Sequence, residues 1–143
     1  MTRRGAILSV AAAPGKPAKQ FLNPVGKTKP TGYTQVVSAA PGRMIFVSGQ
    51  GGADSDGKMP EDFASQARNT FENIKRCLTA GGAKFADIVK INYYLTDLAH
   101  ATELRRIRAD YLNMENPPAA TLVQAGLSKG LLLEVEATAI VPE

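Results

Sequence analysis

Residues 61–82, with the sequence EDFASQARNTFENIKRCLTAGG, decide the fold class of this 143-residue chain. Apolar side chains recur here at intervals of four and three residues, which is the spacing of one face of an α-helix. Pro60 and the two acidic residues after it suit a first helical turn, and Gly81-Gly82 suits a helix end. The sequence therefore predicts a helix over about 61–80 that buries one face. That face consists of Phe63, Ala67, Phe71, Ile74 and Leu78.

The segment that follows, residues 87–95, alternates in the way of a β-strand. Because both of its faces carry apolar side chains, we expect a central strand covered partly on each side. One face holds Val89, Ile91, Tyr93 and Leu95, and the other holds Ile88, Lys90, Asn92 and Tyr94.

Further elements follow outward from this helix and strand. Before them, residues 33–39 and 43–48 predict two strands joined by a tight turn at Pro41-Gly42. After them, residues 99–112 predict a second helix that Pro117-Pro118 breaks. Its inner face would hold Ala101, Leu104, Ile107 or Arg108, and Tyr111. Strands at 120–126 and 131–141 complete the order β-β-α-β-α-β-β.

Two helices can cover only one face of such a sheet, yet the strands carry apolar residues on both faces. No third layer is available in the sequence, so self-association is the expected way to bury the other face. We therefore expect an oligomer with pockets at subunit boundaries.

The positive charge of the chain is concentrated at one end. Residues 1–43 hold seven Lys or Arg and no acid, whereas residues 44–143 hold ten cations and thirteen acids, so a segment of +7 precedes a body of −3. Residues 1–31 are also rich in Pro and Gly and predict a basic N-terminal arm, followed by one domain at 32–143. A net acidic body argues against nucleic acid as a partner, and no apolar stretch is long enough to span a membrane. A cytoplasmic protein is expected.

The chain has a single cysteine, Cys77, and a single histidine, His100. This leaves no disulfide framework and no Cys/His metal cluster, so we expect no metal and no cofactor. Cys77 lies beside the apolar face of the first helix, which predicts a buried thiol that is not reactive.

Four runs of residues are informative together: FVSGQ at 46–50, QARNTFENI at 66–74, IVKINYYLTDL at 88–98 and EVEA at 134–137. In this order and spacing they resemble the RidA/YjgF family of reactive-intermediate deaminases. The resemblance implies an α+β, chorismate-mutase-like fold with two helices on one face of a mixed sheet, a homotrimer, and a small-metabolite pocket between subunits. It also implies hydrolytic deamination of small enamine or imine acids, formed by pyridoxal-phosphate enzymes, to 2-keto acids and ammonia.

One departure from the family pattern concerns the clamp for the substrate carboxylate. The family carries an arginine in a Pro-Ala-Arg stretch, and an arginine suits this task because its planar guanidinium pairs with a carboxylate through two hydrogen bonds. Here the arginine position falls on Ala119, or on Ala120 with a shift of one residue. Two function classes thus stay open: a hydrolase of the family type, and a non-deaminating relative that binds a metabolite or a protein partner.

Other family positions persist and define candidate site residues. The resemblance implies that Tyr33, Gly49 and Thr121 contact the substrate beside Ala119, and that Ser48 and Glu136 position water or an oxygen. Structural alternatives stand beside these roles: Gly49 as a turn residue, Tyr33 as an interface aromatic, and Glu136 as a solvent-facing strand residue.

Arg105 is a candidate replacement for the missing clamp. It lies in the run ELRRIR at 103–108, where deaminating relatives tend to carry an asparagine near the pocket. The alternative is a surface or interface salt bridge, which is usual for three arginines within four positions. Lys129 is a weaker candidate. A ribonuclease or translation inhibitor is a third reading with less support, because the chain has no pair of histidines and no aromatic-basic RNA platform.

Overall fold

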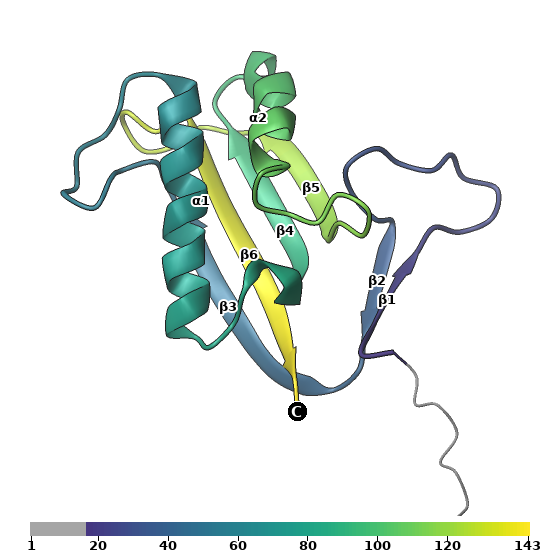
Figure 1. Cartoon of the computed structure of the whole chain (residues 1–143). Coiled ribbons are helices and arrows are strands. Elements are labelled where there is room, and N and C mark those ends of the chain that lie inside the picture. Colours follow the sequence, from purple (N-terminus) through teal and green to yellow (C-terminus); the bar gives the residue numbers. More distant parts are fainter. Residues whose placement is uncertain (1–16) are drawn as a thin grey trace, which may run out of the picture.

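A computed structural model describes residues 17–143, which form a four-stranded sheet, two helices and a separate two-stranded ribbon (Figure 1). The expected arm at 1–31 therefore lies partly outside the described residues. The strands are β1 (Lys19–Leu22), β2 (Val36–Ala39), β3 (Gly42–Gln50), β4 (Ile88–Leu95), β5 (Ala119–Gln124) and β6 (Leu133–Pro142). The helices are α1 (Phe63–Ala80) and α2 (Ala101–Arg108), and short 3-10 turns lie at Phe85–Asp87 and Leu98–His100.

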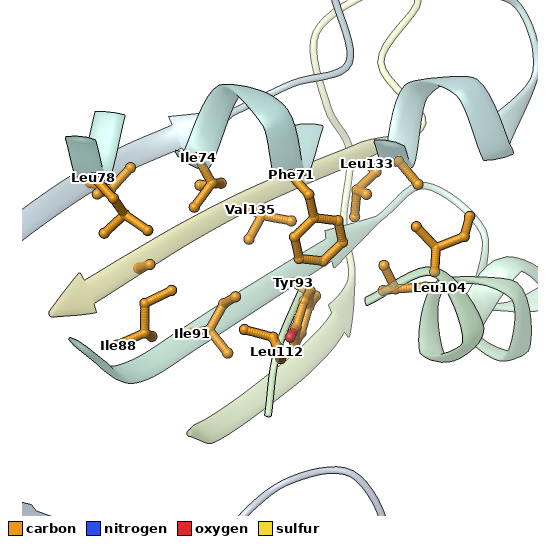
Figure 2. Close-up of a cluster of buried hydrophobic side chains, with 14 of the residues drawn as sticks. Phe71, Ile74, Leu78, Ile88, Ile91, Tyr93, Leu104, Leu112, Leu133 and Val135 are labelled. Carbon is orange, nitrogen blue, oxygen red and sulfur yellow. The ribbon is translucent and has the colours of Figure 1, made fainter. Parts of the chain in front are cut away.

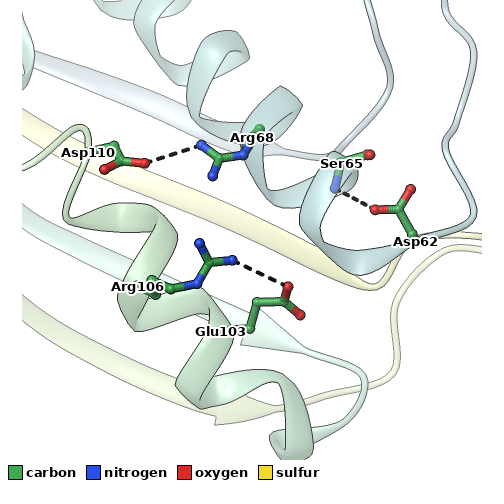
Figure 3. Close-up of polar contacts among 6 residues, drawn as sticks. All are labelled: Asp62, Ser65, Arg68, Glu103, Arg106 and Asp110. Atoms are coloured by element: carbon green, nitrogen blue, oxygen red, sulfur yellow. Dashed lines mark hydrogen bonds and ion pairs between the residues drawn. The ribbon is translucent and has the colours of Figure 1, made fainter.

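Helix α1 confirms the helix predicted over 61–80. Asp62 caps it, because an Asp62 carboxylate oxygen accepts a hydrogen bond of 2.8 Å from the Ser65 amide that has no partner within the helix (Figure 3). Gly82 ends the turn after the helix with φ +72°, a conformation that glycine adopts without strain.

The four-stranded sheet has the order β3-β6-β4-β5, and it is mixed because β4 and β5 are parallel while the other pairs are antiparallel. Both helices lie on one face of this sheet (Figure 1). The fold class is thus the α+β arrangement that the sequence predicts, with two helices on one face of a mixed sheet.

The core lies between the helices and the covered face of the sheet (Figure 2). Phe71, Ile74 and Leu78 of α1 pack onto alternate residues of β4 and β6. Each of these three helix side chains is 1% exposed or less. The predicted alternation is right for Ile91, Tyr93 and Leu95. It is wrong for Val89, which is only half-buried, and for Ile88, which is buried, because a bulge between Ile88 and Lys90 turns Ile88 instead of Val89 toward the core.

One prediction about the first strands is wrong. The strands at 33–39 and 43–48 do not form a hairpin with each other: β2 pairs with β1, and β3 pairs with β6. Pairing with β6 places Val47 of β3 in the core under α1, which a hairpin with β2 would not provide. Strand β1 lies within the segment predicted as an arm.

Other boundaries differ by a few residues. Helix α2 ends at Arg108 instead of 112, and residues 110–112 continue as hydrogen-bonded turns. Cys77 is half-buried and packs against the core, so the prediction of a buried thiol holds only in part. Among residues 17–143, no helix is both long enough and apolar enough to cross a membrane.

The sheet face turned away from the helices carries large exposed apolar side chains. Met44 and Phe46 of β3 are 53% and 72% exposed, and Val123 of β5 lies on the same face. This is the uncovered face that the sequence led us to expect.

Candidate functional site

A cavity of about 300 Å³ lies on the uncovered face of the sheet and is called here the sheet-face cavity. Three neighbouring strands supply its polar lining, because alternate residues of each strand point to the same side. Ser48 comes from β3, Lys90 and Asn92 from β4, and Glu136 from β6. Phe46, Val47, Ala137 and Thr138 complete its lining.

The Glu136 carboxylate is held by two donors from β4. The Asn92 side-chain amide donates a hydrogen bond of 2.9 Å and the Tyr94 hydroxyl one of 2.7 Å to the same oxygen of Glu136. These two hydrogen bonds lower the pKa of Glu136, because both stabilise the ionised form. Glu136 is therefore an anionic acceptor, suited to orienting water and poorly suited to donating a proton at neutral pH.

A second cavity, also of about 300 Å³, lies at the β5 edge of the sheet and is called here the edge cavity. It is bounded by β5, by α2 and by the segment that leads into β2. Two hydrogen bonds fix that segment: the Thr34 hydroxyl and the Thr34 amide donate to the carbonyls of Pro117 and Pro118, at 2.6 and 3.2 Å. The lining consists of Thr31, Tyr33, Tyr93, Arg105, Arg108, Ala120, Thr121 and Leu122.

Helix α2 contributes two guanidinium groups to the edge cavity. Arg105 and Arg108 are three residues apart and so lie on one side of the helix. Arg105 is exposed, whereas Arg108 is only 5% exposed and its guanidinium carbon lies 5.4 Å from the centre of the Tyr93 ring. Burial raises the pKa of Tyr93 to about 12, although the positive charge of Arg108 opposes this shift.

The two cavities are neighbours along the sheet. The Lys90 ammonium lines the sheet-face cavity and donates a hydrogen bond of 2.9 Å to the hydroxyl of Thr121, which lines the edge cavity. A smaller hollow of about 250 Å³ borders both residues.

The structure divides the predicted site residues into two groups. Tyr33, Arg105 and Thr121 meet in the edge cavity, and Ser48 and Glu136 meet in the sheet-face cavity. Gly49 and Ala119 line neither. A Cβ at Gly49 would overlap the Glu134 carboxylate, and Ala119 pairs with Lys90 in the parallel ladder of β4 and β5.

Sequence reasoning missed Arg108, Lys90 and Asn92 as cavity residues. A signal for Arg108 was its place at a buried helix position next to Ile107, and a signal for Lys90 and Asn92 was their alternation on the second face of a central strand. Lys129 lines neither cavity. Within residues 17–143, no three side chains of His, Cys, Asp or Glu gather as a metal site would require.

Two helices on one face of a mixed sheet, with cavities against the other face and the edge, define the class of the chain as an α+β protein. Within that class, the chain belongs to the RidA/YjgF family, because the family model described as "Endoribonuclease L-PSP" matches residues 27–141.

Individual relatives agree with this assignment. The RutC family protein PH0854 of Pyrococcus horikoshii is 32% identical over 124 residues, which cover 85% of this chain and 97% of the relative. The "Putative reactive intermediate deaminase TdcF" of Escherichia coli K12 is 33% identical over 103 residues, covering 69% of this chain and 80% of TdcF. The crystal structure of RidA from Psychrobacter sp. PAMC 21119 matches with a TM-score of 0.67 and 34% identity, covering 83% of this chain and 92% of that one.

Proposed function

We propose that this protein is a RidA-type hydrolase that converts small enamine or imine acids to 2-keto acids and ammonia. The observation that carries the proposal is the meeting of Arg105 with Tyr33 and Thr121 in the edge cavity. The strand position of the family arginine is Ala119, which has no charge and does not line the edge cavity, whereas Arg105 of α2 lines it beside Thr121, two residues further along β5.

The proposed reaction is a hydrolysis. An enamine acid first takes a proton on carbon and becomes an imine. Water then adds to the carbon of the C=N bond, the C–N bond breaks, and the nitrogen leaves as ammonia while that carbon becomes the ketone of the 2-keto acid. Arg105 clamps the substrate carboxylate, Tyr33 and Thr121 offer hydroxyl groups, and the anionic Glu136 with Ser48 orients the water.

The proposed active site needs more than one copy of the chain. Within one protomer the clamp and the water-positioning groups line different cavities. In a homotrimer that packs the uncovered sheet faces together, the edge cavity of one copy would meet the sheet-face cavity of its neighbour. The exposed Phe46 and Met44 support this packing. Action in the cytoplasm is part of the same proposal.

The test is formation of 2-keto acid from 2-aminoacrylate generated in situ, measured against a buffer control. We expect the protein to accelerate keto-acid formation. In Arg105→Ala the rate should fall by at least about tenfold, because the variant loses a charge-assisted hydrogen bond to the substrate carboxylate. Arg106→Ala is the matched control: Arg106 lies next to Arg105 but forms an exposed ion pair of 3.6 Å with Glu103 (Figure 3). Absence of acceleration by the wild-type protein would refute the proposed activity.

A non-deaminating binding protein is the second candidate. The replacement of the family arginine by Ala119 favours it, because a strand guanidinium is the family's own clamp. This candidate predicts no acceleration of keto-acid formation together with measurable binding of small acids, so the same assay distinguishes the two functions.

A further inference from the structure

Two residues that line the edge cavity each have a buried polar atom without a hydrogen-bond partner among the described residues. These atoms are Nε of Arg108 and the hydroxyl of Tyr93, and their side chains are 5% and 1% exposed. Buried polar groups in proteins are almost always satisfied, so each unsatisfied group requires an explanation. Both side chains line one cavity, which is large enough for a small ligand.

Arg108 also has no carboxylate partner. The ion pairs among residues 17–143 are Arg68 with Asp110 and Arg106 with Glu103, and neither involves Arg108. The first 16 residues contain no Asp or Glu, so no acidic side chain of that segment can pair with it. The face of the Tyr93 ring offsets part of the desolvation free energy of the charge, but burial of an unpaired guanidinium still destabilises the fold.

The backbone makes room for this guanidinium. Gly32 has φ +81°, and a Cβ there would overlap Nη2 of Arg108. Arg105 stands one turn away on the same side of α2, at the exposed part of the same cavity. No residue lining the cavity is acidic, so it holds two positive charges within about 300 Å³.

We propose that the ligand of the edge cavity is a small dicarboxylate, with one carboxylate on Arg108 and the second on Arg105. This inference rests on the proposed function and refines its substrate class to enamine or imine acids with a second carboxylate. A dianion neutralises both guanidinium groups, whereas a monocarboxylate leaves one charge uncompensated.

The experiment is calorimetric titration of the full chain with unreactive probes, so binding is measured independently of catalysis. Succinate and butyrate have four carbons each, but succinate carries two negative charges and butyrate carries one. We expect succinate to bind at least about tenfold more tightly than butyrate, and more tightly than inorganic phosphate. Stronger binding of phosphate than of succinate would overturn the proposal, because both guanidinium groups would then converge on one compact dianion.

Three variants test which residues carry the preference. Arg108→Met and the exposed-site variant Arg105→Met should each reduce succinate binding to about the affinity of butyrate, while Arg106→Met should bind as the wild type does. If Arg108→Met does not fold, Arg105→Met decides alone. Equal binding of succinate and butyrate by the wild type would overturn the proposal, and so would a preference that survives Arg105→Met.

These outcomes are separable from those of the proposed function. Keto-acid formation without a succinate preference would refute only the dicarboxylate ligand. A succinate preference without keto-acid formation, both from 2-aminoacrylate and from an imine acid that carries a second carboxylate, would refute only the hydrolase. Carboxylates of a neighbouring copy could instead pair with the two guanidinium groups. That arrangement predicts no preference among the probes and a shift of oligomer mass in Arg105→Met, which also contradicts the proposal.

Discussion

At the scale of single residues, the position of the Arg108 guanidinium depends on Gly32, because a side chain at residue 32 would overlap it. Gly32 also has a positive φ, which residues with a side chain rarely adopt. Tyr93 borders the same guanidinium from the sheet side. These two neighbours, one a residue without a side chain and one an aromatic ring, hold a buried positive charge beside a cavity. Substitution of each neighbour tests its contribution separately.

We expect Gly32→Ala to destabilise the fold and to weaken succinate binding. The positive φ costs about 1–2 kcal/mol for a residue with a Cβ, and the added methyl group displaces the Arg108 guanidinium. Gly57→Ala is the matched control, because Gly57 has φ +80° but no atom within 4 Å of the added Cβ. Urea unfolding and succinate titration of both variants check this. Equal succinate binding by the two variants would contradict the contact between Gly32 and Arg108.

The free energy of unfolding of the wild type should fall at high pH, and we expect it to fall less in Tyr93→Phe. The pKa of Tyr93 is raised to about 12 in the folded protein, mainly by burial, from 10.0 for an ordinary tyrosine. Between these two values the unfolded chain releases the proton and the folded chain keeps it, so wild-type stability falls by about 1.4 kcal/mol per pH unit. Denaturant unfolding between pH 9 and pH 12 measures the difference. Parallel curves for the two proteins would count against a buried, neutral Tyr93.

At the scale of elements, α1 is joined to the loops around the sheet by Gln66, a polar residue that is only 1% exposed. Its side-chain amide donates to the carbonyls of Pro60 and Gly130 at 2.8 Å, and its side-chain oxygen accepts from the Leu132 amide at 2.9 Å. One glutamine thus satisfies three backbone groups from two loops and orients α1 over β6.

We expect Gln66→Ala to lower the free energy of unfolding by about 2–4 kcal/mol, because three backbone groups lose their partner. Arg68→Ala on the same helix is the control. Its exposed ion pair of 3.2 Å with Asp110 should contribute less than about 1 kcal/mol (Figure 3). Similar losses in the two variants, measured by urea unfolding, would show that Gln66 does not tie these loops to α1.

The sequence predicts α1, β4 and β6 well, because each has a clear apolar period, and α1 also has Gly81-Gly82 at its end. It does not predict β1, since four residues among glycines and prolines show no period, nor the pairing of β3 with β6, which is a contact between distant residues. For the site, family resemblance points to Arg105, but it cannot point to Arg108. The burial of Arg108 depends on Gly32 and Tyr93, which are distant from Arg108 in the sequence.

At the scale of the whole molecule, the uncovered sheet face connects oligomerisation with the proposed activity. Exposed apolar side chains from β3 and β5 lie on the same face as the sheet-face cavity. If this face packs against other copies, the cavity becomes enclosed and its polar residues come close to a neighbouring edge cavity.

We expect Phe46→Asp to convert the proposed trimer to a monomer while the fold is retained, because Phe46 is 72% exposed in the single chain. Sedimentation equilibrium measures the mass. Val25→Asp is the control, since Val25 is fully exposed in the loop after β1 and lies outside the four-stranded sheet. A wild-type monomer, or a Phe46→Asp protein of unchanged oligomer mass, would contradict packing through this face.

The most direct test of the shared site is keto-acid formation by mixed oligomers. Arg105→Ala damages the edge cavity and Glu136→Gln damages the sheet-face cavity, so each variant alone should be nearly inactive. After the two are unfolded together and refolded at equal concentration, about a quarter of the sites would combine an intact edge cavity with an intact sheet-face cavity from a neighbour. We predict recovery of about this fraction of wild-type activity. Activity no greater than the sum of the separate variants would contradict a site shared between copies.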